Sequence, residues 1–202
     1  MAVQRLIIDG YGQIELNNCA FRRDGRIEAQ CKPNKTNFAD ANRVLENGML
    51  LAVDNVAREV KLPVANETLP IAINYSSEHI YDERTPGLKN FYLKGTNDFL
   101  PRLGYLSVGD KFTENCISYD NTVDDDWAPD TETYPGDTDD SAFRRNMLAA
   151  NLATTPIYGG ICTNGSILVS ATAPTVGPVL RLIKVTTMPD GTIGFKFQVY
   201  AC

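Results

Sequence analysis

The sequence is dominated by short runs of β-branched, aromatic and leucine residues that are separated by glycine-containing turns. Asn164-Gly165 and Asp190-Gly191 each separate two such runs. Asn-Gly and Asp-Gly pairs are strong hairpin signals, because glycine adopts a positive φ without steric cost. Many short strands with a turn every ten residues or so predict a mainly β fold, either a sandwich or a barrel.

Two long runs near the C-terminus carry different patterns. Residues 193–200 alternate between apolar and polar side chains, which predicts an edge or surface strand. Residues 179–187 carry apolar side chains in both phases, which predicts a strand covered on both faces. Further runs of strand character lie at 5–8, 13–16, 26–31, 49–53, 59–62, 71–75, 91–93, 105–108, 111–113, 161–163 and 167–170. Of these, 49–53 and 59–62 are expected to form a hairpin.

One or two short helices are expected beside the strands. Residues 37–46 fit a helix in which Asn37 is the N-cap, although a strand from Arg43 onward is the competing interpretation. A second helix is expected after Ser141, because that residue is a good N-cap and apolar side chains follow at i, i+4 spacing. Thr154-Thr155-Pro156 would end it.

Charge is unevenly distributed along the 202 residues, whose formal net charge is −6. Residues 120–140 hold nine acidic residues and no base, and they have no periodicity, which predicts an acidic loop insert. The rest of the chain is close to neutral and offers no broad basic face, so we expect no nucleic-acid partner. We divide the chain into an N-terminal β-hairpin or arm, residues 1–40, and a β-rich domain, residues 41–202, that carries the insert.

Neither a membrane span nor a secretory signal is expected, because no apolar run approaches about 20 residues and the N-terminus lacks an apolar core. The five cysteines include no C-x-x-C pair, so they are interpreted as reduced thiols of a protein made in a cytoplasm. A bridge between Cys19 and Cys31 stays open, since a hairpin could bring them together.

No set of catalytic side chains stands out. The single histidine, His79, lies in a polar stretch typical of a surface connection, and no nucleophile elbow or phosphate-binding glycine loop is present. The aspartates of 120–140 could hold calcium weakly, but they lack the spacing of a calcium loop, so a solvated or partner-facing loop is the simpler interpretation. We therefore expect no catalytic residue, no cofactor and no metal ligand. Trp127 and Tyr134, in this stretch, could anchor a partner or pin the loop.

Several segments together resemble small structural proteins of tailed bacteriophage virions, of the auxiliary or decoration kind that coats capsids. These are residues 46–51 (ENGMLL), 59–63 (EVKLP), 69–76 (LPIAINYS), 101–110 (PRLGYLSVGD) and the stretch around 188–191 (MPDG). The resemblance is diffuse over 43–118 and 178–200. It implies a non-enzymatic β-rich protein of the virion, made in the bacterial host cytoplasm. Its partners would be the major capsid protein or other virion proteins, and it would be a homo-oligomer.

On this hypothesis residues 1–40 would be an attachment arm. Arg22, Arg23 and Arg26 cluster around one turn and could pair with acidic residues of the lattice, although a solvated basic turn is an equal alternative. Other interpretations are a component of the tail or adsorption apparatus, or a carbohydrate-binding β module that uses Trp127, Tyr134 and the aspartates. A carboxylate-dependent glycosidase would need two acids at a fixed separation, and the sequence favours no such pair.

Overall fold

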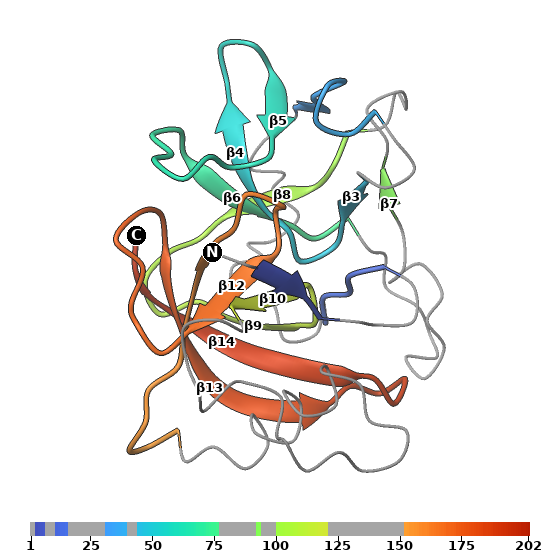
Figure 1. The fold of residues 1–202 in the computed structure, drawn as a ribbon. Helices are drawn as coiled ribbons and strands as arrows, with labels where there is room; N and C mark the ends of the chain where they lie inside the picture. The colour runs from blue at the N-terminus through green and yellow to red at the C-terminus, as the bar shows by residue number, and fades with distance from the viewer. Residues whose placement is uncertain are drawn as a thin grey trace.

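The computed structural model is all-β in the residues that it describes, which are 3–6, 11–15, 31–39, 44–76, 92–93, 100–120 and 152–202. These residues form a seven-stranded, a five-stranded and a two-stranded sheet (Figure 1). Each of the two larger sheets contains one parallel pair, β10 with β12 and β2 with β5, among antiparallel pairs. The predicted mainly β fold is confirmed.

The seven-stranded sheet curls into a half-barrel (Figure 1). Its strands, in spatial order, are β1 (Val3–Arg5), β10 (Ile117–Asp120), β12 (Ile167–Ser170), β11 (Tyr158–Ile161), β13 (Val179–Thr187), β14 (Ile193–Ala201) and β9 (Lys111–Glu114). β9 is the last strand in this order and β10 is the second, next to β1, but the two are successive parts of one stretch, 111–120. The curl therefore brings the two ends of the sheet to the same piece of chain.

The five-stranded sheet lies above the half-barrel in Figure 1. Its strands, in spatial order, are β2 (Lys32–Pro33), β5 (Glu59–Lys61), β4 (Leu50–Asp54), β6 (Ile71–Asn74) and β8 (Leu103–Tyr105). The two-stranded sheet pairs β3 (Leu45–Glu46) with β7 (Tyr92–Leu93). The turn at Gly109, where φ is +96°, links β8 of the smaller sheet to β9 of the larger one.

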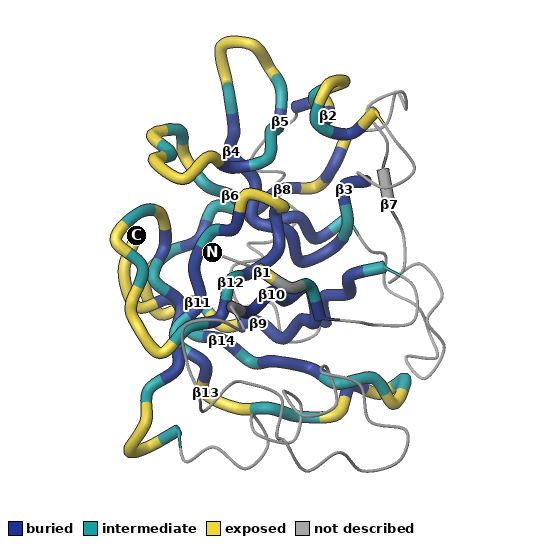
Figure 2. The backbone as a smooth tube through the Cα atoms, viewed as in Figure 1, coloured by how far each residue is buried: buried dark blue, intermediate teal, exposed yellow. Residues whose placement is uncertain are grey.

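Two apolar cores hold these sheets together, and their buried strands are dark blue in Figure 2. The larger core fills the curled sheet, where the rings of Phe112 and Phe197 lie 6.0 Å apart and both side chains are fully buried. The smaller core lies on the five-stranded sheet and includes Phe38, Leu51 and Val53. Burial of each such side chain contributes about 1.5–3 kcal/mol.

Three of the hairpins expected from the sequence are confirmed. β4 pairs antiparallel with β5, β11 with β12, and β13 with β14. Gly165 and Gly191 occupy the turns of the last two with φ of +87° and +88°. Those angles explain why glycine follows the Asn or Asp at each turn, since a side chain there is strained.

The alternation of β14 is confirmed, and of its two predicted settings, an edge or a surface strand, the edge is wrong. Phe195, Phe197 and Val199 are buried, while Lys196 and Gln198 are only half-buried. The strand nonetheless pairs on both sides, with β13 and with β9. Period-2 alternation reports which faces of a strand are covered, and it carries no information about the hydrogen bonds at its edges.

The prediction that β13 is covered on both faces is also wrong. Leu182 pairs with Phe197 and Lys184 pairs with Lys196, so Ile183 is one extra residue in the ladder. Leu182 is buried, whereas Ile183 is 37% exposed. After the bulge Val185 packs against the larger core. The extra residue moves the inward positions from one phase to the other, which explains apolar residues in both.

No helix occurs in the described residues, and hence none that could cross a membrane. The helix predicted for 37–46 is wrong at its end, because Leu45–Glu46 form strand β3, as the competing interpretation expected. Pairing with β7 overrides the local capping signal there. The helix predicted after Ser141 lies largely outside the described residues, as does the acidic insert after residue 120.

The division of the chain at residue 40 stays a prediction. The described parts of residues 1–40 contribute to both larger sheets, since β1 pairs with β10 and β2 pairs with β5. Ile14 forms an isolated bridge with Glu114, and Leu6 and Ile14 are buried in the larger core. The N-terminal segment therefore runs along the stretch 111–120 that closes the half-barrel.

Candidate functional site

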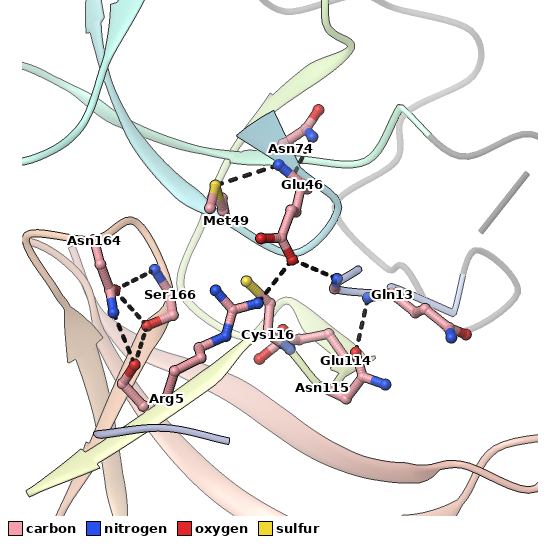
Figure 3. A network of polar contacts seen from close by, with 12 residues as sticks. Arg5, Gln13, Glu46, Met49, Asn74, Glu114, Asn115, Cys116, Asn164 and Ser166 are labelled. Carbon is pink, nitrogen blue, oxygen red and sulfur yellow. Dashed lines mark hydrogen bonds and ion pairs between the residues drawn. The ribbon is translucent and has the colours of Figure 1, made fainter. Parts of the chain in front are cut away.

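A network of buried and half-buried polar contacts joins the N-terminal segment to both larger sheets (Figure 3). The Glu46 carboxylate is its centre. One of its oxygens accepts a hydrogen bond from the Arg5 guanidinium at 2.8 Å and another from the backbone N–H of Gly12. A charge-assisted pair of this kind is stronger than a neutral hydrogen bond. It fixes β1 and residues 11–15 to strand β3.

The turn that follows Glu46 is held by its own set of contacts. The side-chain amide of Asn74 donates to the Glu46 carbonyl oxygen at 2.8 Å, and the Gly48 N–H donates to the Asn74 carbonyl oxygen at 2.8 Å. Gly48 has a φ of +86°, and a Cβ there would lie 2.5 Å from the Glu114 carboxylate. Only glycine lets this turn approach the larger sheet so closely.

Two ionisable side chains, Glu114 and Cys116, lie beneath that turn, and both are fully buried. The Glu114 carboxyl accepts a hydrogen bond from the Cys116 N–H through one oxygen, and its other oxygen has no partner among the described residues. Burial raises the pKa of Glu114 well above its usual value, against the weaker opposing effects of the Cys116 N–H and the Arg5 charge. Burial likewise raises the pKa of the Cys116 thiol. Burial therefore favours the neutral form of both groups.

Backbone pairing continues the junction on either side of these groups. Asn115 accepts a hydrogen bond from the Gln13 N–H through its side-chain oxygen at 2.8 Å, and its own N–H donates to the Gln13 carbonyl at 3.1 Å. The side-chain amide of Asn164, in the β11–β12 turn, donates to the Ser118 hydroxyl at 3.0 Å. Five parts of the chain therefore meet at one junction, namely the N-terminal segment, the turn after Glu46, β6, residues 114–118 and the β11–β12 turn.

The chemistry available at this junction is structural. A cysteine nucleophile must be a thiolate that substrate can reach, and Cys116 is neutral and fully buried. Glu114 is sealed in the same way, and the Glu46 carboxylate is bound to Arg5 and Gly12. No cluster of three or more metal-ligating side chains occurs within the described ranges. The arrangement holds the N-terminal segment in place.

A second feature is exposed. We call residues 34–38 and 54–59, two neighbouring turns of the smaller sheet, the hairpin end. Asp54 accepts hydrogen bonds from the N–H groups of Val56 at 3.1 Å and Ala57 at 2.8 Å, and its other oxygen pairs with Lys61 at 2.8 Å. The Ala57 N–H, and next Lys61, lower the pKa of Asp54, which keeps it ionised. The Val56 side chain is left 97% exposed on a turn whose Val56 and Ala57 N–H groups are bound to Asp54.

Side chains also tie the two turns of the hairpin end to each other. The Asn34 side-chain amide donates to the Glu59 carboxylate at 2.7 Å, and Asn37 accepts a hydrogen bond from the Leu62 N–H at 3.1 Å. The Lys32 N–H donates to the Arg58 carbonyl oxygen at 3.0 Å. The hairpin end is therefore one braced surface, and the tip of the β4–β5 hairpin is yellow at the top of Figure 2.

The residues singled out from the sequence are not placed by the structure. Arg22, Arg23, Arg26, Trp127 and Tyr134 lie outside the described residues, and so does His79. Cys31, Cys116, Cys162 and Cys202 are free thiols, and Cys19, the residue that could have bridged to Cys31, lies outside the described residues.

Sequence reasoning missed both features described above. The Asp54-Asn55 turn was visible as a hairpin signal, but nothing in the sequence indicated that Val56 is exposed. Arg5 and Glu46 are 41 residues apart and belong to no motif. Comparisons of the chain with protein-family models, with curated proteins and with solved structures each gave no match.

Proposed function

We propose that the protein is a non-enzymatic structural protein of a tailed-bacteriophage virion, an auxiliary capsid protein that binds the capsid lattice. The resemblance of residues 43–118 and 178–200 to such proteins supports the proposal. The observation that carries it is the hairpin end, where an apolar side chain, Val56, is 97% exposed on a turn that is braced from within. Water-exposed valine on a fixed turn favours contact with another protein surface.

The bracing has an energetic consequence for binding. Association is opposed by the ordering of loops and side chains at the interface, and a turn that is already ordered loses less freedom. Asp54 and Asn34 order the two turns of the hairpin end before any partner arrives. On a lattice that offers many equivalent sites, several weak contacts of this kind together give stable attachment.

The buried junction supports the same role. Arg5 and Gly12 bind the Glu46 carboxylate of β3, and Asn74 of β6 binds the Glu46 carbonyl oxygen, so the N-terminal segment is linked to the two-stranded and the five-stranded sheets. A scaffold of this kind suits a protein whose task is to hold a fixed surface. Glu114 and Cys116 are fully buried in this scaffold, where a substrate cannot reach them.

Locating the chain in a cryo-EM map of its parent virion tests the proposal. Density for the half-barrel on the outer surface of the shell, with turns directed at the lattice, would support it. Density confined to the tail would replace it with the tail or adsorption role. A shell and a tail that both lack the chain would end the virion hypothesis.

A further inference from the structure

At the hairpin end the acidic side chains already have partners within the molecule, whereas two basic side chains are, within the part of the chain that the structure describes, free to bind another molecule. Asp54 is bound to Lys61 and to two backbone N–H groups, and Glu59 accepts a hydrogen bond from Asn34. Lys35 and Arg58 are exposed, and no carboxylate among the described residues pairs with either of them. The surface therefore presents two available cations beside the exposed Val56, although the whole chain has a net charge of −6.

A partner for this surface must supply negative charge and an apolar group. The chain itself contains such a segment, since residues 120–140 hold nine acids, no base and the only tryptophan, Trp127. Opposite charges on two copies attract over a distance that depends on salt, about 30 Å at 0.01 M and about 8 Å at 0.15 M ionic strength. A tryptophan is also the side chain that most often anchors a protein interface.

We infer that the hairpin end binds the acidic stretch, residues 120–140, of a second copy of this chain. Lys35 and Arg58 meet the carboxylates of that stretch, and Val56 is the apolar contact. The inference goes beyond the proposed function but concerns the same surface, so a copy whose hairpin end holds the acidic stretch of a neighbour does not offer that hairpin end to the lattice. Two copies that make this contact in both directions form a two-fold dimer, whereas a contact made in one direction only builds a ring or an open chain.

The test is sedimentation velocity of the full-length chain over a range of concentrations, at low and at high ionic strength. The first variant is the double change Lys35→Glu and Arg58→Glu. Its control is Lys111→Glu with Lys184→Glu, because both are exposed lysines on the larger sheet and the net charge changes equally. We expect the wild type and the control to associate at low ionic strength, and the hairpin-end variant to associate about tenfold more weakly.

A second pair of variants tests the apolar contact. Val56→Asp should weaken association, whereas Val108→Asp should not, because Val108 is a 68% exposed valine on a different turn. Far-UV circular dichroism verifies that each variant is folded, and Val56→Ser is the milder substitute if Val56→Asp is not. A labelled peptide with the sequence of residues 120–140 should bind the wild type and lose affinity about tenfold for the Lys35→Glu, Arg58→Glu variant.

Three results would overturn the inference. The first is a wild type that stays monomeric at every concentration and at both ionic strengths. The second is equal association of the hairpin-end variants and their controls. The third is an acidic peptide that fails to bind, which would remove residues 120–140 as the partner. None of these results would bear on the location of the chain in a virion, so the two proposals can fail separately.

Discussion

Replacing Glu114 by glutamine should abolish one pH dependence of stability. The side chain is fully buried, and burial raises its pKa well above the usual value. In the unfolded chain a glutamate titrates near pH 4.3. Between that pH and the folded-state pKa, the folded protein therefore binds one proton more than the unfolded chain. The free energy of unfolding then falls as the pH rises, by about 1.4 kcal/mol per pH unit.

Glutamine has the same shape and does not titrate, and it can still accept the hydrogen bond from the Cys116 N–H. The stability of Glu114→Gln should therefore gain on the wild type by about 1.4 kcal/mol per pH unit between pH ~4.3 and the folded-state pKa of Glu114. Below that pH both forms are uncharged and the difference should be constant. Urea unfolding of both proteins at about pH 5, 6 and 7, all above the pKa of an unfolded glutamate, measures the difference in the free energy of unfolding.

Glu114→Ala is the matched control for this prediction. It also removes the titration, but it leaves the Cys116 N–H buried without its acceptor, which costs about 1–3 kcal/mol at every pH. Its stability should therefore be lower and should follow the pH dependence of the glutamine variant. Parallel pH profiles for the wild type and Glu114→Gln would refute the reasoning, because they would mean that Glu114 is already ionised in the folded protein.

Three further predictions concern stability alone. Glu46→Ala leaves the half-buried Arg5 without its carboxylate, so the free energy of unfolding in urea should fall by about 2–3 kcal/mol. A fall below about 1 kcal/mol would show that the Arg5–Glu46 pair does not stabilise the junction. Arg58→Gly should raise stability by about 0.5–1 kcal/mol, because Arg58 has a φ of 58°; an unchanged or lower Tm would contradict this. Leu182→Ala should cost about 2–4 kcal/mol and Ile183→Ala less than about 1 kcal/mol, and equal losses would show that the bulge is misplaced.

Local sequence was sufficient for the hairpins. Asn164-Gly165 and Asp190-Gly191 specify their turns through the conformational freedom of glycine, and the strands on each side pair with each other. The alternation of 193–200 likewise gave the buried face of β14. These features depend on residues close together in the chain, so no distant contact is needed to predict them.

The bulge at Ile183 shows where local pattern stops being informative. Apolar residues in both phases of β13 fit a doubly covered strand as well as a strand with one extra residue. Only the ladder with β14 distinguishes the two. The helix predicted at 37–46 is wrong at its end for a similar reason, because the pairing of Leu45 and Glu46 with β7 is a distant contact that outweighs the local capping residues.

The sequence by itself determined that this chain forms short strands joined by tight turns, since turn chemistry and side-chain alternation act over a few residues. Tertiary structure decided that Arg5 meets Glu46, that Glu114 is buried with a raised pKa, and that Val56 is exposed. Burial and charge pairing depend on which distant segments come together. Those segments are joined by the curl of the larger sheet around 111–120, which no local pattern encodes.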